Sequence, residues 1–198
     1  MADDVLLARI AAGDVDALAE LFRRHQQAIY RFVLHLSGSP ALADDVTQDV
    51  FMTVIREARK FEPGRAAVPS WLCGIARNFV RRRLALERGT ASMDAELEES
   101  SAPVVTPDPV GDLTTAERIE SLRRAVLRLP MRYREAVVLC DLQEMTYVDA
   151  AAALECPVGT VRSRLNRGRA LLAAKMQAEQ RDTTRGVARR TRITKALA

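Results

Sequence analysis

Residues 146–172 read TYVDAAAALECPVGTVRSRLNRGRALL, and this stretch contains two helix starts only eleven residues apart. Thr146 and Asp149 have the spacing of a capping box, in which the two side chains satisfy free backbone N–H groups at a helix start. Pro157 suits the first turn of a second helix, where its missing N–H would be unpaired anyway. The stretch therefore predicts a helix-turn-helix.

The second of these helices has two distinct faces. At 100° per residue, one stripe carries the small and apolar residues Val161, Leu165, Gly168 and Leu172. The opposite side carries polar residues that suit the edges of DNA bases, namely Arg162, Ser163, Asn166 and Arg167. Arg164 and Arg169 flank this side and are able to neutralise phosphates. The pattern predicts a helix that packs on one face and reads DNA with the other.

An ordinary solvated basic helix is the alternative interpretation of this segment. We favour DNA binding because helix length, turn and arginine placement all agree with the docking geometry of the motif. The charge of the chain is also segregated. From Glu155 to the end there are eleven arginine and lysine residues against three acidic ones, although the whole chain carries only +4.

Residues 89–112 are acidic and rich in proline. They hold six acidic residues, no arginine or lysine, and Pro103, Pro107 and Pro109. With no clear apolar period, this stretch predicts an extended linker between two domains. The expected fold is all-α, with two small helical domains at residues 1–88 and 113–176. Residues 177–198 are expected to form a basic, disordered tail.

Several function classes find no support in the sequence. No apolar run approaches the roughly eighteen residues of a membrane span, and the N-terminus lacks the pattern of a signal peptide, so we expect a cytoplasmic protein without membrane insertion. Cys73, Cys140 and Cys156 form no metal-ligand spacing with the two histidines. With no phosphate loop or nucleophile elbow, we expect neither a cofactor nor enzyme activity.

Two further helices are predicted upstream of the linker. The first starts at Ser39-Pro40 and runs to about Lys60, with an apolar arc opposite a polar face. The second runs from Ser70 to about Arg88 and is rich in arginine. Trp71 at its start is expected to be a core anchor rather than a base-stacking residue. From periodicity alone, the polar face of the first helix is best explained as a solvated surface.

Several motifs in this order resemble the extracytoplasmic-function (ECF) class of RNA polymerase sigma factors, in the sigma-70 family. The run Pro157–Leu165, PVGTVRSRL, is similar to the start of the class's minus-35 recognition helix. Glu155 stands where the class often has glycine, and a positive φ there costs on the order of 1 kcal/mol. The residues that this resemblance assigns to the minus-35 element are Thr160, Arg162, Ser163, Arg164, Asn166 and Arg167.

The upstream helices carry the rest of the resemblance. The run 44–51, DDVTQDVF, is similar to the segment that docks on the β′ clamp helices of core RNA polymerase. This implies core-polymerase contacts by Asp44, Asp45, Gln48, Asp49 and Arg56. The run from Trp71 to Asn78 resembles the segment that captures a flipped base of the minus-10 element. This implies minus-10 contacts by Arg77, Asn78, Arg81 and Arg82.

The resemblance also implies the partners of the protein. They are core RNA polymerase, through its β′ clamp helices and β flap, promoter DNA, and an anti-sigma factor that holds the protein inactive. A stand-alone helix-turn-helix regulator, which never binds polymerase, remains the alternative. Such a regulator would need neither the helix around Asn78 nor the docking face around Asp45.

Overall fold

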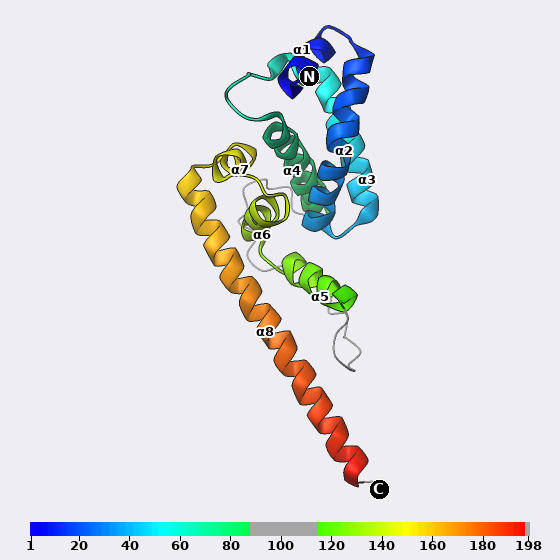
Figure 1. Ribbon diagram of the computed structural model, residues 1–198, viewed down its shortest axis with the longest axis vertical. Helices are drawn as coiled ribbons and strands as arrows, with labels where there is room; N and C mark the ends of the chain where they lie inside the picture. Colours follow the sequence, from blue (N-terminus) through cyan, green and yellow to red (C-terminus); the bar gives the residue numbers. More distant parts are fainter. Residues whose placement is uncertain (88–114, 197–198) are drawn as a thin grey trace.

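The computed structural model describes residues 1–87 and 115–196, with side chains up to residue 177. The described residues form helices and contain no strand (Figure 1). The elements are α1 (Asp3–Ala11), α2 (Val15–Ser37), α3 (Pro40–Glu57), the short 3-10 helix η1 (Ala58–Lys60), α4 (Val68–Glu87), α5 (Thr115–Leu127), α6 (Met131–Val137), the π-helical turn η2 (Val138–Leu142), α7 (Tyr147–Leu154) and α8 (Val158–Ala196). The predicted all-α fold is confirmed, whereas the predicted linker lies outside the described residues.

The helices α1 to α4 pack into one unit. Asp14 caps α2 by accepting a hydrogen bond from the backbone N–H of Ala17 at 3.0 Å, and Gly38 ends the helix with a φ of 74°. Ser39 then caps α3 through the N–H of Leu42 at 3.2 Å. The buried stripes of these helices meet in a core that includes Leu21, Phe32, Val50 and Leu72. The predicted helix start at Ser39-Pro40 is confirmed.

The helices α5 to α8 form the second unit, in which α7 and α8 make the predicted helix-turn-helix. Thr146 caps α7 by accepting a hydrogen bond from the N–H of Asp149 at 3.1 Å. Gly168 lets α6 approach α8 closely, because a Cβ there would lie 2.7 Å from Val137 Cγ2 and 3.2 Å from the carbonyl oxygen of Tyr133. Glycine on the packing stripe is therefore required by this contact rather than tolerated.

The last helix differs from the sequence prediction. Residues 177–198 were expected to be disordered, but α8 continues through Ala196, about 58 Å for its 39 residues. Residues 173–196 contain no proline and are rich in alanine and arginine, which favour helix over other conformations. Figure 1 shows the second half of α8 running away from the remainder of the molecule.

The turn between α7 and α8 contains a residue in an unfavourable conformation. Glu155 has a φ of 51°, in the left-handed region that glycine adopts most readily. We expect Glu155→Gly to raise the free energy of unfolding by about 0.5–1 kcal/mol, since relief of strain exceeds the added entropy of the unfolded chain. Urea denaturation measures this change. Glu155→Ala keeps the Cβ and is the control, and an equal gain in that variant would contradict the explanation.

The two units contact each other along several helices. The α4 helix packs against α7, and the C-terminal half of α2 lies against α5, α6 and η2 (Figure 1). Leu127 of α5 covers Gly38, where a Cβ would lie 2.9 Å from Leu127 Cδ1. Residues far apart in the sequence therefore form one continuous set of contacts.

Candidate nucleic-acid interface

The polar face of α8 is exposed in the first turns of the helix, within residues 158–177. Arg162, Ser163, Asn166 and Arg167 are exposed, while Thr160 and Arg164 are partly exposed. On the opposite side, Val161, Leu165 and Gly168 are buried and Leu172 is partly buried. The structure thus brings the six predicted minus-35 residues to one helix, with their neighbours on the packing stripe holding that helix in place.

Aromatic side chains orient two arginines of this face. The guanidinium of Arg162 lies 5.7 Å from the ring centre of Tyr147, a residue of α7. Hydrogen bonding from Arg167, and secondarily from Arg132, lowers the pKa of the Tyr133 hydroxyl. Such contacts limit the conformations of the long arginine side chains before any ligand binds.

Arg169, which the sequence placed near phosphates, has an acidic partner within its own unit. Its Nε and Nη2 atoms donate to the carboxylate of Asp141 at 3.1 and 2.5 Å. This bidentate geometry is the strongest form of an arginine–carboxylate contact. Arg169 therefore ties α8 to the π-helical turn and is not available as a free phosphate ligand in this conformation.

The predicted minus-10 residues on α4 do not share one exposed surface. Asn78, Arg81 and Arg82 are exposed, but Arg77 is buried. The Nε atom of Arg77 donates to Glu135 Oε1 of α6 at 3.0 Å, and Glu135 is fully buried. Sequence reasoning missed Glu135 because a single glutamate in a predicted helix gives no sign of a partner that is 58 residues away.

Trp71 has the packing role that the sequence favoured. It is half-buried against the core, and its ring lies 5.4 Å from that of Phe61, tilted by 59°. The α4 helix begins at Val68, two residues before the predicted start, so the preceding loop comprises residues 61–67. Trp71 and Phe61 hold the start of α4 beside this loop.

The predicted polymerase-binding residues of α3 lie on two stripes. Asp44 and Gln48 line a groove, whereas Asp45, Asp49 and Arg56 lie on a neighbouring stripe. Arg83 of α4 reaches this second stripe, with its Nη2 atom 3.1 Å from Asp49 and its Nη1 atom 4.0 Å from Asp45. Arg56 donates to Thr53 Oγ1 at 3.0 Å. The acidity of the second stripe is therefore partly neutralised from within the chain.

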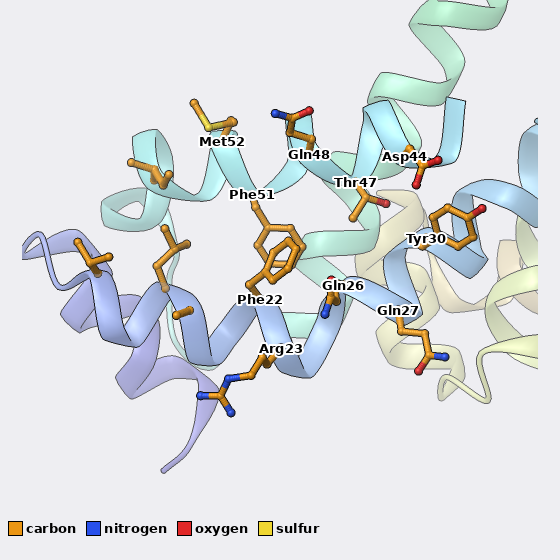
Figure 2. A pocket seen from close by; sticks show the side chains of 14 residues that line it. Phe22, Arg23, Gln26, Gln27, Tyr30, Asp44, Thr47, Gln48, Phe51 and Met52 are labelled. Atoms are coloured by element: carbon orange, nitrogen blue, oxygen red, sulfur yellow. The ribbon is translucent and has the colours of Figure 1, made fainter. Parts of the chain in front are cut away.

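The groove runs between α2 and α3 and has a volume of about 1010 Å³ (Figure 2). Phe22 and Phe51 meet edge-on at its floor, with ring centres 4.8 Å apart. Met52 and Ile55 are each 48% exposed and lie beside Phe22, which is 38% exposed, so the groove gathers several exposed apolar side chains in one patch. Polar groups line the rest, including Arg23, Gln26, Gln27, Tyr30, Asp44, Thr47 and Gln48. An apolar floor with a polar rim is the anatomy of a protein–protein interface.

The sequence analysis found only one wall of this groove. It assigned Asp44 and Gln48 of α3 to a contact surface, but it did not single out Phe22 and Tyr30 of α2. The available signal was Phe22 beside Arg23, next to a run of polar residues at 23–27. Aromatic residues are enriched at protein–protein interfaces relative to the rest of the surface.

The described residues contain no disulfide, no cluster suited to a metal ion and no membrane-spanning helix. All three cysteines are free, and burial raises the pKa of the Cys73 thiol to about 12. Among residues 1–87 and 115–196, no group of three or more histidine, cysteine or acidic side chains is placed to hold a metal ion. In the same residues, no helix combines the length and apolar character that crossing a bilayer requires.

Comparison with known proteins matches both units to families. Residues 21–90 match the Sigma-70 region 2 family, and residues 119–172 match the family described as Sigma-70, region 4. The chain is 39% identical to the ECF RNA polymerase sigma factor SigM of Mycobacterium tuberculosis over 172 residues, covering 86% of this chain and 83% of SigM. It is 36% identical to SigE of Mycolicibacterium smegmatis, covering 80% of this chain but only 62% of SigE.

Two solved structures have the same overall fold. CnrH in complex with the cytosolic domain of CnrY aligns with a TM-score of 0.68 and 27% identity, covering 90% of this chain and 99% of CnrH. RpoE of Bartonella quintana, in complex with the anti-sigma factor NepR, aligns with a TM-score of 0.63 and 26% identity, covering 82% of this chain and 98% of RpoE. With two family models and relatives of high coverage in agreement, the chain belongs to the sigma-70 family as an ECF RNA polymerase sigma factor.

Proposed function

We propose that this sigma factor binds core RNA polymerase and directs it to promoters with two elements, read by separate helices. The observation that carries the proposal is the presence of three surfaces in one chain. These are the groove between α2 and α3, the arginine-rich face of α4, and the polar face of α8. A stand-alone helix-turn-helix regulator needs only the last of them.

The groove is the proposed docking site for core polymerase, through a helix of the β′ clamp. Its apolar floor offers contact area, and Met52 adds a side chain that adapts to an incoming surface. Asp44 and Gln48 on its rim offer oxygen acceptors to basic side chains of the partner. Asp45, Asp49 and Arg56 would contribute from the neighbouring stripe, where Arg83 competes for the two carboxylates.

The minus-35 element is assigned to α8, in the major groove. Arg162 and Arg167 are suited to guanine edges and Asn166 to adenine, while Thr160, Ser163 and Arg164 would position the helix on the backbone. In the family, the β flap of polymerase contacts this unit. Residues 113–176 would then form the minus-35 domain, and the basic continuation of α8 would add salt-sensitive attraction to DNA.

The minus-10 element is assigned to α4 and the loop before it, within residues 1–88. A base that leaves the stack exposes its Watson–Crick edge, with which the amide of Asn78 is able to pair. Unstacking costs a few kcal/mol, which contacts of Arg81 and Arg82 with phosphates help to offset. Arg77 would join them only after separation from Glu135.

We also propose how the protein is regulated and where in the cell it acts. CnrH and RpoE were solved with CnrY and with the anti-sigma factor NepR, respectively, and we propose that an anti-sigma factor likewise controls this chain. The protein would act in the cytoplasm, where its polymerase works. It would catalyse no reaction itself, because all bond formation belongs to the polymerase.

The docking site is tested by a charge placed in the groove. We expect Met52→Lys to weaken binding to core polymerase by about tenfold or more. In the complex the lysine would be buried without an acidic partner, and it would repel basic groups of the polymerase. Fluorescence anisotropy of the labelled sigma factor, titrated with core polymerase, gives the affinity. Leu86→Lys is the matched control, because Leu86 is also exposed but lies on α4, outside the groove. Equal losses in both variants would contradict this docking site.

A further inference from the structure

A buried ion pair joins the two units of the chain. Arg77 of α4 donates from Nε to Glu135 Oε1 at 3.0 Å, and the Nε atom of Arg81 lies 3.5 Å from the same oxygen. The side chains of Arg77 and Glu135 are only 9% and 1% exposed. Glu135 thus places a carboxylate on two of the arginines that the proposed function assigns to DNA.

Small residues bring α7 close to α4 beside this pair. Gly74 faces the backbone of α7, where a Cβ on it would lie 3.5 Å from the carbonyl oxygen of Ala153. The α7 helix presents alanines to this contact, with Ala150 and Ala153 both buried. Ser70 Oγ also donates to Asp149 Oδ1 at 3.3 Å. The glycine and the alanines therefore permit an approach that larger side chains would prevent.

A third contact lies at the other end of the interface. Arg134 of α6 donates from Nη1 to the carbonyl oxygen of Leu36 at 2.6 Å. That carbonyl belongs to the last turn of α2, where helix carbonyls have no partner in their own helix and favour positive charge. The interface thus has polar attachments at both ends.

We propose that α6 and α7 act as an intramolecular cover for Arg77 on the arginine face of α4, with the carboxylate of Glu135 in the place of a DNA phosphate. The proposal rests on the proposed function, because it takes that face to be the minus-10 surface. In this closed form Arg77 is withheld from nucleic acid. The chain must open between α4 and the α6–α7 segment before the minus-10 element is bound.

The energetics of the contact suit a reversible cover. Removing two charges from water opposes the gain from their attraction, so a buried ion pair contributes little net stability. Within the described residues, the second carboxylate oxygen of Glu135 is buried without a hydrogen-bond partner. Opening hydrates that oxygen and frees Arg77 for a phosphate, which makes a charge-assisted bond of the same kind.

Two variants are designed to open the closed form, one on each side of the interface. Glu135→Gln keeps the shape of the side chain but leaves Arg77 buried without a counter-charge. Gly74→Gln puts a long side chain against the α7 backbone, while glutamine favours helix over glycine and so preserves α4. Their matched controls are Asp141→Asn, which removes an ion pair within the second unit, and Gly74→Ala, whose Cβ fits at 3.5 Å.

The chain has suitable positions for a donor and an acceptor of fluorescence energy transfer. Trp71, the single tryptophan, lies on α4, and Cys156 lies in the turn between α7 and α8. Cys73 is 3% exposed with a thiol pKa of about 12, so it resists labelling. In a Cys140→Ser background, a dansyl group on Cys156 accepts energy from Trp71 when the units are in contact. Anisotropy of a labelled oligo-dT of about 20 nucleotides then measures access to the arginine face.

The proposal predicts strong energy transfer in the parent protein and in both controls. It predicts weak transfer in Glu135→Gln and Gly74→Gln, together with about tenfold tighter binding of oligo-dT, since loss of one partner strongly destabilises a buried ion pair. Circular dichroism verifies that helix content is unchanged.

Two results would overturn it in distinguishable ways. Strong transfer in both opening variants would show that the ion pair and the small-residue contact do not hold the units together. Weak transfer without tighter binding of oligo-dT would leave the contact standing but show that it covers no nucleic-acid surface. The second result counts against the assignment of α4 to the minus-10 element, whereas the first leaves that assignment untouched.

Discussion

Transcription from the cognate promoter is expected to fall by about 10- to 100-fold when Arg167 is replaced by alanine, since a good base-edge contact contributes about 1–3 kcal/mol. Arg167 is exposed on the polar face of α8 and hydrogen-bonds to Tyr133, so its side chain is both accessible to DNA and oriented. Run-off transcription with purified core polymerase, on a promoter found with the unmodified protein, gives the ratio of yields.

Arg169→Ala is the control that separates base recognition from general loss of positive charge. Arg169 lies only two residues away on the same helix, but Asp141 already binds its guanidinium. We expect its replacement to change the yield by no more than about twofold, because a guanidinium already held by Asp141 adds little to the attraction for DNA. If both variants lost activity equally, non-specific electrostatics would explain the effect and the assigned base contact would be wrong.

The largest expected effect on stability lies on the other side of the same helix. Leu165 is 1% exposed and sits on the stripe that packs against α6 and α7. We expect Leu165→Ala to lower the free energy of unfolding by about 2–5 kcal/mol. The variant loses buried apolar surface, and the cavity that is left adds a further cost. Urea denaturation followed by circular dichroism measures the change.

Leu171→Ala, on the same helix, tests whether the effect follows burial. Leu171 is 37% exposed, so its replacement should change the free energy of unfolding by no more than about 0.5 kcal/mol. Similar losses at both positions would mean that helix propensity, rather than packing, dominates in α8. The two faces of this helix would then be less distinct than their burial indicates.

The elements set by local chemistry were predictable from the sequence. The helix starts at Ser39-Pro40 and at Thr146 are visible as short-range patterns and are confirmed. The assignment of Val161 and Leu165 to the packing stripe is confirmed as well, since a period of 3.6 residues fixes which side chains share a helix face.

The contacts between the units were not predictable in the same way. Glu135 and Arg77 lie 58 residues apart, and no local pattern connects them. The sequence analysis therefore placed Arg77 with Arg81 and Arg82 near phosphates, whereas the structure buries it. Gly74 gave a visible signal, as glycine in the middle of a helix, but its reason is a backbone on another helix. The continuation of α8 was missed because composition suggested a loose tail.

The most direct test of the central claim is run-off transcription with core polymerase on a library of genomic fragments, comparing the intact protein with Asn78→Ala. The account predicts specific start sites that share two sequence elements at a fixed spacing and that are lost with Asn78→Ala. Binding of DNA without start sites that depend on polymerase would contradict it, and would identify the chain as a stand-alone regulator instead.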